Sequence, residues 1–138
     1  MKRRWWVDLT GVLDVLLDRP PHVAAAAAMW ASAERGEVDL LVAAHAVTTL
    51  HYTAQRGRGQ VFADRCVADV LSVFGVATVD DAVLRQAVSL GWPDFEDAVV
   101  ASAGQVAGFS AIVTRDPRGF TGLAQPVIDP ATAVALLA

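Results

Sequence analysis

Short apolar segments alternate with longer helical patterns along the whole chain, and this alternation constrains the fold more than any other feature of the sequence. Strands are expected at residues 5–8, 40–42, 76–79 and 111–114, with a possible edge strand at 127–128. Helices are expected at residues 12–17, 22–34, 46–56, 61–74, 81–90 and 94–107, with a last one from Pro130. Short apolar strands separated by helices predict an α/β sandwich around a mostly parallel sheet.

The bulk properties fit one domain spanning residues 1–138. Hydrophobic residues make up 54% of the chain, which argues against intrinsic disorder. The single cysteine, Cys66, allows neither an internal disulfide nor a thiolate zinc site, and we interpret it as a small apolar helix residue. The longest uncharged apolar run covers residues 23–31, far below the roughly 20 residues that span a bilayer. We therefore expect a cytoplasmic protein that is not associated with a membrane.

Several carboxylates fall where ligands bind in such folds, beyond the carboxyl ends of the strands. Asp8 closes the first strand, and Asp116 follows the strand at 111–114. Asp94 and Asp97 open the helix after a Gly-Trp-Pro turn and share one helical face. Carboxylates in one cleft repel each other unless a cation or a proton intervenes, and oxygen ligands suit Mg²⁺ or Mn²⁺. Such an ion can activate water and stabilise a phosphoryl transition state.

Most of these carboxylates also have a purely structural interpretation. Asp94 can be a helix N-cap, with Asp97 favoured in the first turn by the helix dipole. Asp116 precedes a proline and can be an ordinary turn residue. Asp8 is different, because it lies between Val7 and Leu9 at the end of a buried strand and needs a partner. Carboxylates alone do not decide between the two interpretations.

Three segments taken together resemble the PIN-domain family, in the branch related to VapC toxins. They are Val7-Asp8-Leu9-Thr10-Gly11-Val12-Leu13-Asp14-Val15-Leu16-Leu17, Asp94-Phe95-Glu96-Asp97-Ala98, and Ile112-Val113-Thr114-Arg115-Asp116 followed by Gly119-Phe120. Their order and spacing agree over essentially the whole chain, and the set is specific although each motif alone is weak. The resemblance implies a PIN-like three-layer sandwich and hydrolysis of an RNA phosphodiester by metal-activated water.

The same resemblance implies a role for each acidic residue. Asp8 and Asp97 would bind Mg²⁺ or Mn²⁺ directly, and Asp116 would bind it directly or through water. Asp94 would support this group from beside the ion, and Thr114 would shape the floor of the pocket. The family also implies a homodimer and a cognate antitoxin protein that covers the cleft.

Two positions depart from the family pattern. Thr10 stands where the family usually has Asn, although its hydroxyl can still hydrogen-bond Asp8 or a bound water. Thr49 stands where the family usually has Glu in a Thr-Glu-Leu pattern, which removes one negative charge and one strong ligand. His45 lies four residues earlier on the same helical face. It is a candidate to replace part of the missing group, and the alternative is a polar residue that lines the cleft.

The net charge of −4 means that the molecule as a whole does not attract nucleic acid. RNA binding would have to rest on metal ions or on local basic groups. Arg56 and Arg58 flank an expected turn at residues 56–59, and Arg115 and Arg118 bracket Asp116. These four arginines are the candidate phosphate contacts, and ordinary solvated loops are the alternative.

The leading prediction is a Mg²⁺- or Mn²⁺-dependent ribonuclease, the toxin of a toxin–antitoxin pair. The substitutions at Thr10 and Thr49 leave open a PIN module with weakened catalysis that acts by binding RNA or a protein. A weaker third hypothesis is a small-molecule phosphatase that uses the same acidic site. Metal titration separates the first two hypotheses, and a panel of substrates separates the first from the third.

Overall fold

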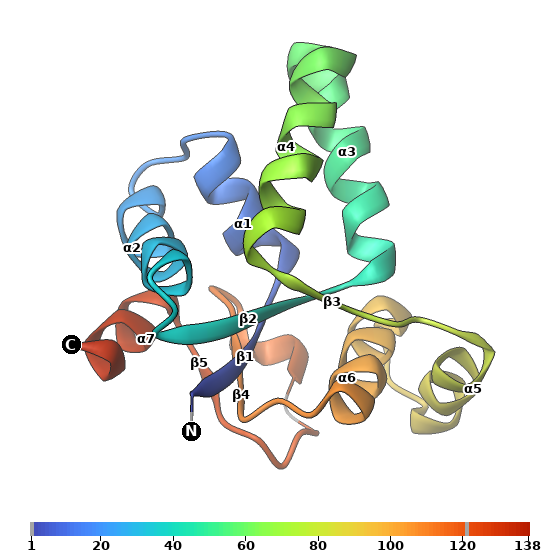
Figure 1. Cartoon of the computed structure of the whole chain (residues 1–138). Coiled ribbons are helices and arrows are strands. Elements are labelled where there is room, and N and C mark those ends of the chain that lie inside the picture. Colours follow the sequence, from blue (N-terminus) through green and yellow to red (C-terminus); the bar gives the residue numbers. More distant parts are fainter. Residues whose placement is uncertain (1, 121) are drawn as a thin grey trace.

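A five-stranded sheet forms the centre of the molecule (Figure 1). The structure is a computed structural model that describes residues 2–120 and 122–138. The strands are β1 (Arg3–Val7), β2 (Val38–Ala43), β3 (Gly75–Ala77), β4 (Ala111–Val113) and β5 (Val127–Ile128). They lie in the order β3-β2-β1-β4-β5, and every neighbouring pair is parallel. The carboxyl ends of all five strands therefore meet at one edge of the sheet.

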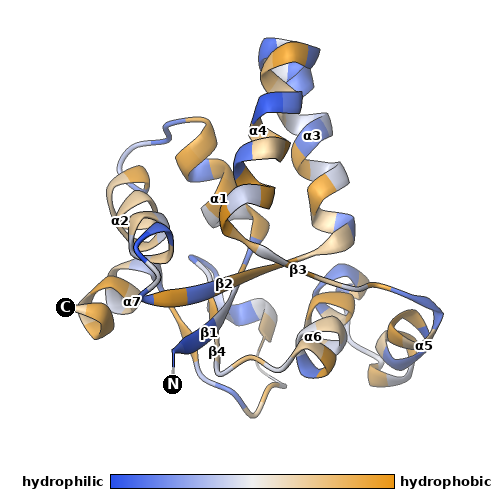
Figure 2. Ribbon diagram, in the orientation of Figure 1, coloured by the Kyte–Doolittle hydropathy of each residue, from blue (hydrophilic) through white to orange (hydrophobic). Residues whose placement is uncertain are grey.

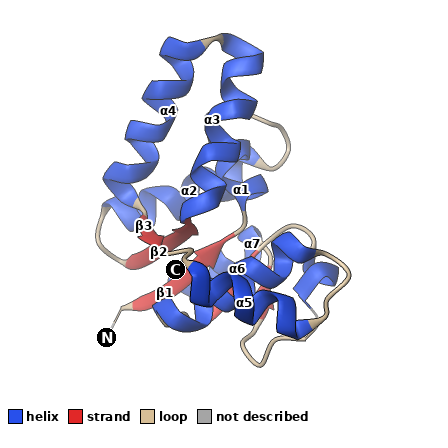
Figure 3. Ribbon diagram, turned by 90° about the vertical axis from the view of Figure 1, so that its right-hand side faces the viewer, coloured by secondary structure: helices blue, strands red, loops and turns tan. Residues whose placement is uncertain are grey.

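Helices cover both faces of this sheet (Figures 1 and 3). They are α1 (Leu9–Leu16), α2 (Val23–Glu34), α3 (Ala44–Arg58), α4 (Gln60–Val73), α5 (Asp81–Leu90), α6 (Phe95–Ala107), the short 3₁₀ helix η1 (Pro117–Phe120) and α7 (Pro130–Leu137). Helices α1, α2, α4 and α7 pack on one face, and α5 and α6 pack on the other. The predicted α/β sandwich is confirmed, with three layers and with a sheet that is wholly parallel across these strands.

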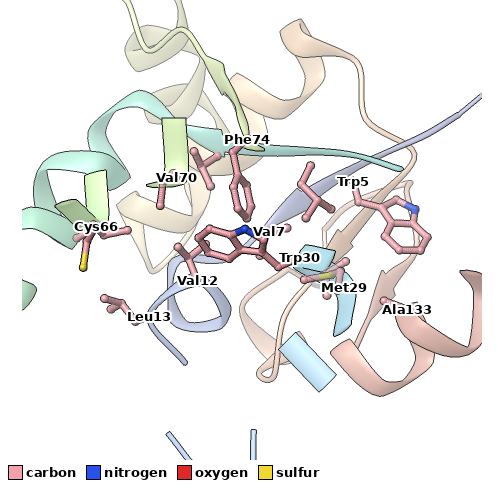
Figure 4. Close-up of a cluster of buried hydrophobic side chains, with 14 of the residues drawn as sticks. Trp5, Val7, Val12, Leu13, Met29, Trp30, Cys66, Val70, Phe74 and Ala133 are labelled. Atoms are coloured by element: carbon pink, nitrogen blue, oxygen red, sulfur yellow. The ribbon is translucent and has the colours of Figure 1, made fainter. Parts of the chain in front are cut away.

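Successive residues of β1 contribute to two hydrophobic cores, one on each face of the sheet. Trp5 and Val7 point into the larger core, where Trp30 of α2 meets Phe74 edge-on with ring centroids 4.9 Å apart (Figure 4). Trp6 points into the other core and packs 6.2 Å from the ring of Phe109. Burial on both faces explains why the strands read as uninterrupted apolar runs.

The start of α1 differs from the sequence-based prediction. A helix was expected over residues 12–17, but the helix begins at Leu9 and Asp8 occupies the N-cap position. The Asp8 side chain makes no capping hydrogen bond to this helix. Its carboxylate accepts a hydrogen bond from Thr114 instead, so the first carboxylate of the chain is turned toward β4.

The expected turn at residues 56–59 is also wrong, because α3 continues through Arg58 and the chain reverses at Gly59 alone. Gly59 has a φ of 86°, a conformation that glycine adopts without a steric penalty. Helices α3 and α4 consequently form a long hairpin that projects from the sheet (Figures 1 and 3). Figure 2 shows hydrophilic and hydrophobic residues interleaved along both of its helices.

The cysteine and three of the four tryptophans belong to the hydrophobic cores. Cys66 is a buried free cysteine on α4, as the sequence predicted. Trp5, Trp6 and Trp30 are core residues, whereas Trp92 is only partly buried. Among the described helices, none has the length and apolar character needed to cross a lipid bilayer.

Candidate functional site

A chain of hydrogen bonds joins the ends of β1 and β4 at the carboxyl edge of the sheet. The backbone N–H of Asp8 donates to the carbonyl of Val113 over 3.0 Å. The buried Thr114 hydroxyl donates to Asp8 Oδ2 over 2.9 Å and accepts from the N–H of Asp116 over 3.1 Å. Thr114 thus orients the Asp8 carboxylate and holds the turn that carries Asp116. Thr114 is one of the buried residues that line the depression beside Asp8.

The second pair of carboxylates lies at the start of α6. Asp94 is the N-cap, and its Oδ1 accepts a hydrogen bond from the N–H of Asp97 over 3.1 Å. The structural interpretation of Asp94 is therefore correct, and it is compatible with a supporting role beside Asp97. The backbone of Gly119 in η1 lies so close to Asp97 that a Cβ added at Gly119 would collide with Asp97 Oδ2. Only glycine leaves this carboxylate in its present position.

The other carboxylates of the site act electrostatically on Asp97. Burial and repulsion by Asp94, Asp8, Glu96 and Asp116 raise the pKa of Asp97 from 3.8 to about 6. Burial also raises the pKa of Asp8, while the hydrogen bond from Thr114 opposes that rise. A cluster of carboxylates that disfavours its own ionisation is stabilised by a cation.

The pKa of Asp116 is shifted in the opposite direction because this residue has a cationic neighbour. Arg118 Nε donates to Asp116 Oδ1 over 3.0 Å, and this contact lowers the pKa of Asp116. The two side chains are 88% and 63% exposed, so water screens the pair and it contributes little to stability. Arg118 is thus a loosely held positive charge within the acidic site.

The site consists of two depressions that share Arg118. One, of about 590 Å³, is lined by Asp8, Thr10, Thr114, Arg115, Asp116, Pro117 and Arg118. The other, of about 280 Å³, is lined by Trp92, Pro93, Asp94, Asp97, Arg118, Gly119 and Gly122. Arg118 therefore borders both the depression of Asp8 and Asp116 and the depression of Asp94 and Asp97.

Carboxylate oxygens are the donors that Mg²⁺ and Mn²⁺ prefer, so the residue types of this site fit either ion. Within residues 2–120 and 122–138, however, no three His, Cys, Asp or Glu side chains are grouped closely enough to ligate one ion. Asp8 is directed at Thr114 and Asp116 at Arg118. An ion shared by these aspartates would require Asp116 to exchange Arg118 for the metal.

The three supporting residues predicted from the sequence lie in different surroundings. Thr10 lines the same depression as Asp8, at the start of α1. Thr49 is an exposed residue of α3. Both ring nitrogens of His45, at the first turn of α3, are buried without a hydrogen-bond partner among the described residues. His45 and Thr49 do not line either acidic depression, so the structure does not bring them together with the aspartates.

The four arginines that are candidate phosphate contacts differ in their exposure and in their partners. Arg118 is the more exposed of the two arginines that bracket Asp116. Arg115 donates two hydrogen bonds to Asp14 of α1 and is therefore held by the protein. Arg56 and Arg58 lie on the α3–α4 hairpin, with their guanidinium groups over the rings of Tyr52 and Phe62 at 5.7 and 5.0 Å.

Sequence reasoning missed the functional potential of Asp14. The residue is completely buried on α1, about one and a half turns after Leu9. A signal was present in the sequence, since a charged residue flanked by Leu13 and Val15 inside an apolar helix must be paired if it is buried.

The fold and its acidic edge together define the class of protein. A family model described as PIN domain matches residues 4–118, and the chain belongs to the PIN-domain family. A comparison with curated protein sequences finds no match.

Solved structures from several organisms have the same fold. VapC20 of Mycobacterium tuberculosis, described as a sarcin–ricin loop cleaving toxin, is 18% identical with a TM-score of 0.67, over 82% of this chain and 90% of that one. A chain of VapBC2 from Rickettsia felis, solved bound to a DNA fragment from the promoter, is 10% identical with a TM-score of 0.69. The match covers 91% of this chain and 98% of that chain. PAE2754 from Pyrobaculum aerophilum is 25% identical with a TM-score of 0.60, over 98% and 89%.

Proposed function

We propose that the protein is a Mg²⁺- or Mn²⁺-dependent endoribonuclease of the VapC type, the toxin of a toxin–antitoxin pair that acts in the cytoplasm. The observation that carries this proposal is the gathering of Asp8, Asp116 and the Asp94–Asp97 pair around two depressions that share Arg118. The raised pKa of Asp97, caused by burial and by the neighbouring carboxylates, supports it. A structural N-cap accounts for Asp94 but not for the approach of Asp8 and Asp116. Membership of the PIN-domain family and the likeness to VapC toxins support the same proposal.

Each residue at the acidic edge has a part in this activity. Asp8, Asp97 and Asp116 would hold the ion, and Asp94 would support Asp97 from the N-cap position. When bound, the ion supplies a Lewis acid for the phosphodiester and lowers the pKa of a water molecule. Thr114 keeps the Asp8 carboxylate directed by donating its hydroxyl hydrogen, which leaves the second oxygen of Asp8 available as a ligand.

The arginines suggest how a polyanion approaches a protein of net charge −4. Arg118 lines both depressions, and a cation bound by Asp116 would release its guanidinium for a phosphate. Arg56 and Arg58 form no ion pair with a carboxylate in the described part of the chain, so both charges remain available. We therefore place the RNA backbone contacts at Arg118 and at the end of the α3–α4 hairpin.

We propose two protein partners, a cognate antitoxin and a second copy of the chain. The structural neighbours include toxin–antitoxin complexes such as VapBC2 and a toxin–antitoxin complex from Klebsiella pneumoniae. In this chain a groove of about 380 Å³ between α1, α2 and α4 is lined largely by apolar side chains, among them Leu16, Trp30 and Phe62. This groove suits an apolar segment of an antitoxin, and a homodimer is the oligomeric state that we expect.

The decisive experiment is calorimetric titration of Mn²⁺ into the wild type and into Asp97→Asn, followed by cleavage assays on a panel of RNAs. Saturable binding that disappears in the variant, together with Mn²⁺-dependent RNA cleavage, is the expected result. Asp8→Asn should have the same effect and keep the fold.

Absence of Mn²⁺ binding at millimolar concentration would refute the nuclease proposal. It would favour the alternative in which Thr49, in place of the usual glutamate, has left a PIN module that acts by binding RNA or a protein. Binding of Mn²⁺ with hydrolysis of small phosphate esters, but not of RNA, would point to a phosphatase.

A further inference from the structure

The buried carboxylate of Asp14 lies outside the acidic site but is connected to it. Asp14 belongs to α1, whose N-cap is Asp8, and its side chain is 0% exposed. Arg115 approaches it with two parallel hydrogen bonds, from Nε to Oδ2 over 2.8 Å and from Nη2 to Oδ1 over 3.2 Å. Arg19 Nη1 lies 3.8 Å from Asp14 Oδ1 and provides a weaker second cation.

Arg115 has one further polar contact. Its Nη1 lies 3.1 Å from Nε2 of His22, the residue that precedes α2. The guanidinium group therefore connects three segments: α1, the start of α2 and the turn after β4. The side chain is 30% exposed, against 88% for Arg118, and its donors are already directed at protein atoms. Arg115 is for this reason better suited to holding the turn than to binding phosphate.

Because of its position in the chain, Arg115 links its contact with Asp14 to the acidic site. Arg115 lies between Thr114, which hydrogen-bonds Asp8, and Asp116. Asp8 is the N-cap of the eight-residue helix α1, and Asp14 lies in its last turn. The Asp14–Arg115 contact thus holds α1, which begins after Asp8, against the turn that carries Asp116.

We propose that Asp14 and Arg115 are positioning residues, which set the geometry of Asp8 relative to Asp116 and thereby the affinity of the site for a divalent cation. This inference rests on the proposed function. A buried ion pair adds little net stability, since apolar residues of similar volume often replace it without loss. Residues that orient metal ligands, by contrast, typically change metal affinity by about 10- to 100-fold when they are altered.

The test removes the pair without leaving a buried unpaired charge. The double variant Asp14→Leu/Arg115→Met should unfold in urea at a midpoint near that of the wild type. Its dissociation constant for Mn²⁺ should rise by about 10- to 100-fold in calorimetry. The matched control is Asp81→Leu/Arg85→Met, which removes an exposed arginine–carboxylate pair on α5 and should leave Mn²⁺ affinity unchanged.

A second measurement needs no metal. The N–H of Asp116 is hydrogen-bonded to Thr114 Oγ1, so loosening of the turn should speed its exchange with solvent in NMR spectra of the metal-free double variant. Wild-type Mn²⁺ affinity in a folded double variant would overturn the proposal, and so would unchanged exchange of the Asp116 N–H. If the double variant does not fold, Arg115→Lys decides in its place, because it keeps the charge but loses the paired hydrogen bonds.

The two proposals fail in different ways. A wild type that binds no Mn²⁺ refutes the proposed function, whereas the exchange of the Asp116 N–H still shows whether Arg115 positions the turn. A wild type that binds Mn²⁺, with a double variant that binds it equally well, refutes only the positioning role.

Discussion

Replacement of Asp97 by asparagine should stabilise the metal-free protein while destroying its metal site. The rise in the pKa of Asp97 from 3.8 to about 6 is a preference of the folded state for the neutral acid. At about 1.4 kcal/mol per pKa unit, this rise corresponds to a gross cost of about 3 kcal/mol for ionised Asp97 at neutral pH. Asparagine has nearly the same shape and no charge, so the variant avoids that cost.

The net gain should be smaller, because Asp97 is partly in contact with water. Solvent screening should remove roughly half of the gross value. The dipole of α6 favours a negative charge in its first turn by about 0.3–1 kcal/mol, and the variant loses this contribution. We therefore expect Asp97→Asn to raise the free energy of unfolding by about 1 kcal/mol at pH 7.5, within the range measurable by urea unfolding.

The pH dependence of this gain has a definite sign. The pKa of Asp97 is higher in the folded protein than in the unfolded chain, so the folded state binds the proton more tightly. Asp97 therefore makes the wild type lose stability as the pH rises from 3.8 toward 6, and the loss is complete above that range. The gain of the variant in free energy of unfolding should have its full value of about 1 kcal/mol at pH 7.5 and should vanish near pH 4.

Added Mn²⁺ should reverse the order of stability. At a concentration of 100 times its dissociation constant, a ligand that binds only the folded state adds about 2.7 kcal/mol. The wild type would then be more stable than the variant. Asp81→Asn, in the exposed first turn of α5, is the control and should lose up to about 1 kcal/mol, because it gives up the dipole contribution and weakens the ion pair with Arg85. A variant less stable than the wild type by the same amount at both pH values would refute this reasoning.

Three further variants test other parts of the site. Gly119→Ala should displace Asp97 or η1 and lower Mn²⁺ affinity at least tenfold in calorimetry, whereas Gly57→Ala, with open space around its Cα, should leave it unchanged; equal affinities would count against the close approach. Arg56→Gln/Arg58→Gln should lower the slope of log K against log salt for single-stranded RNA by about 1.4 in a fluorescence titration, and an unchanged slope would remove the α3–α4 hairpin from the RNA path. Thr49→Glu should leave Mn²⁺ affinity unchanged, because Thr49 lines neither acidic depression, and tighter binding would show that α3 faces the cleft after all.

The sequence predicted the parts of the site that depend on strand ends. Asp8 and Asp116 follow buried parallel strands, and parallel strands present their carboxyl ends at one edge. The helix that Asp94 begins was likewise predictable from local chemistry, since Asp at an N-cap is a strong short-range signal. These features depend on neighbours in the sequence or on the topology of the sheet, and both could be read from the pattern.

The contacts of individual side chains could not be predicted in the same way. Arg115 was assigned to phosphate binding because it flanks Asp116, but its partner Asp14 is 101 residues away in the chain. The approach of Gly119 to Asp97 depends on the course of η1, which no local pattern indicated. The end of α3 was misplaced because Gly57 and Gly59 look alike in the sequence, and only Gly59 has the positive φ that ends the helix.

The order of the strands determines when the acidic site can exist during synthesis. β1 is made first and lies at the centre of the sheet, with β4 as its later partner. Asp8 therefore remains without the Thr114 hydroxyl until 106 further residues have been added. A nascent chain that is still missing β4 has neither Asp116 nor the contact that orients Asp8. The acidic centre is in this sense complete only after β4 and Asp116 have been translated, whatever substrate it acts on.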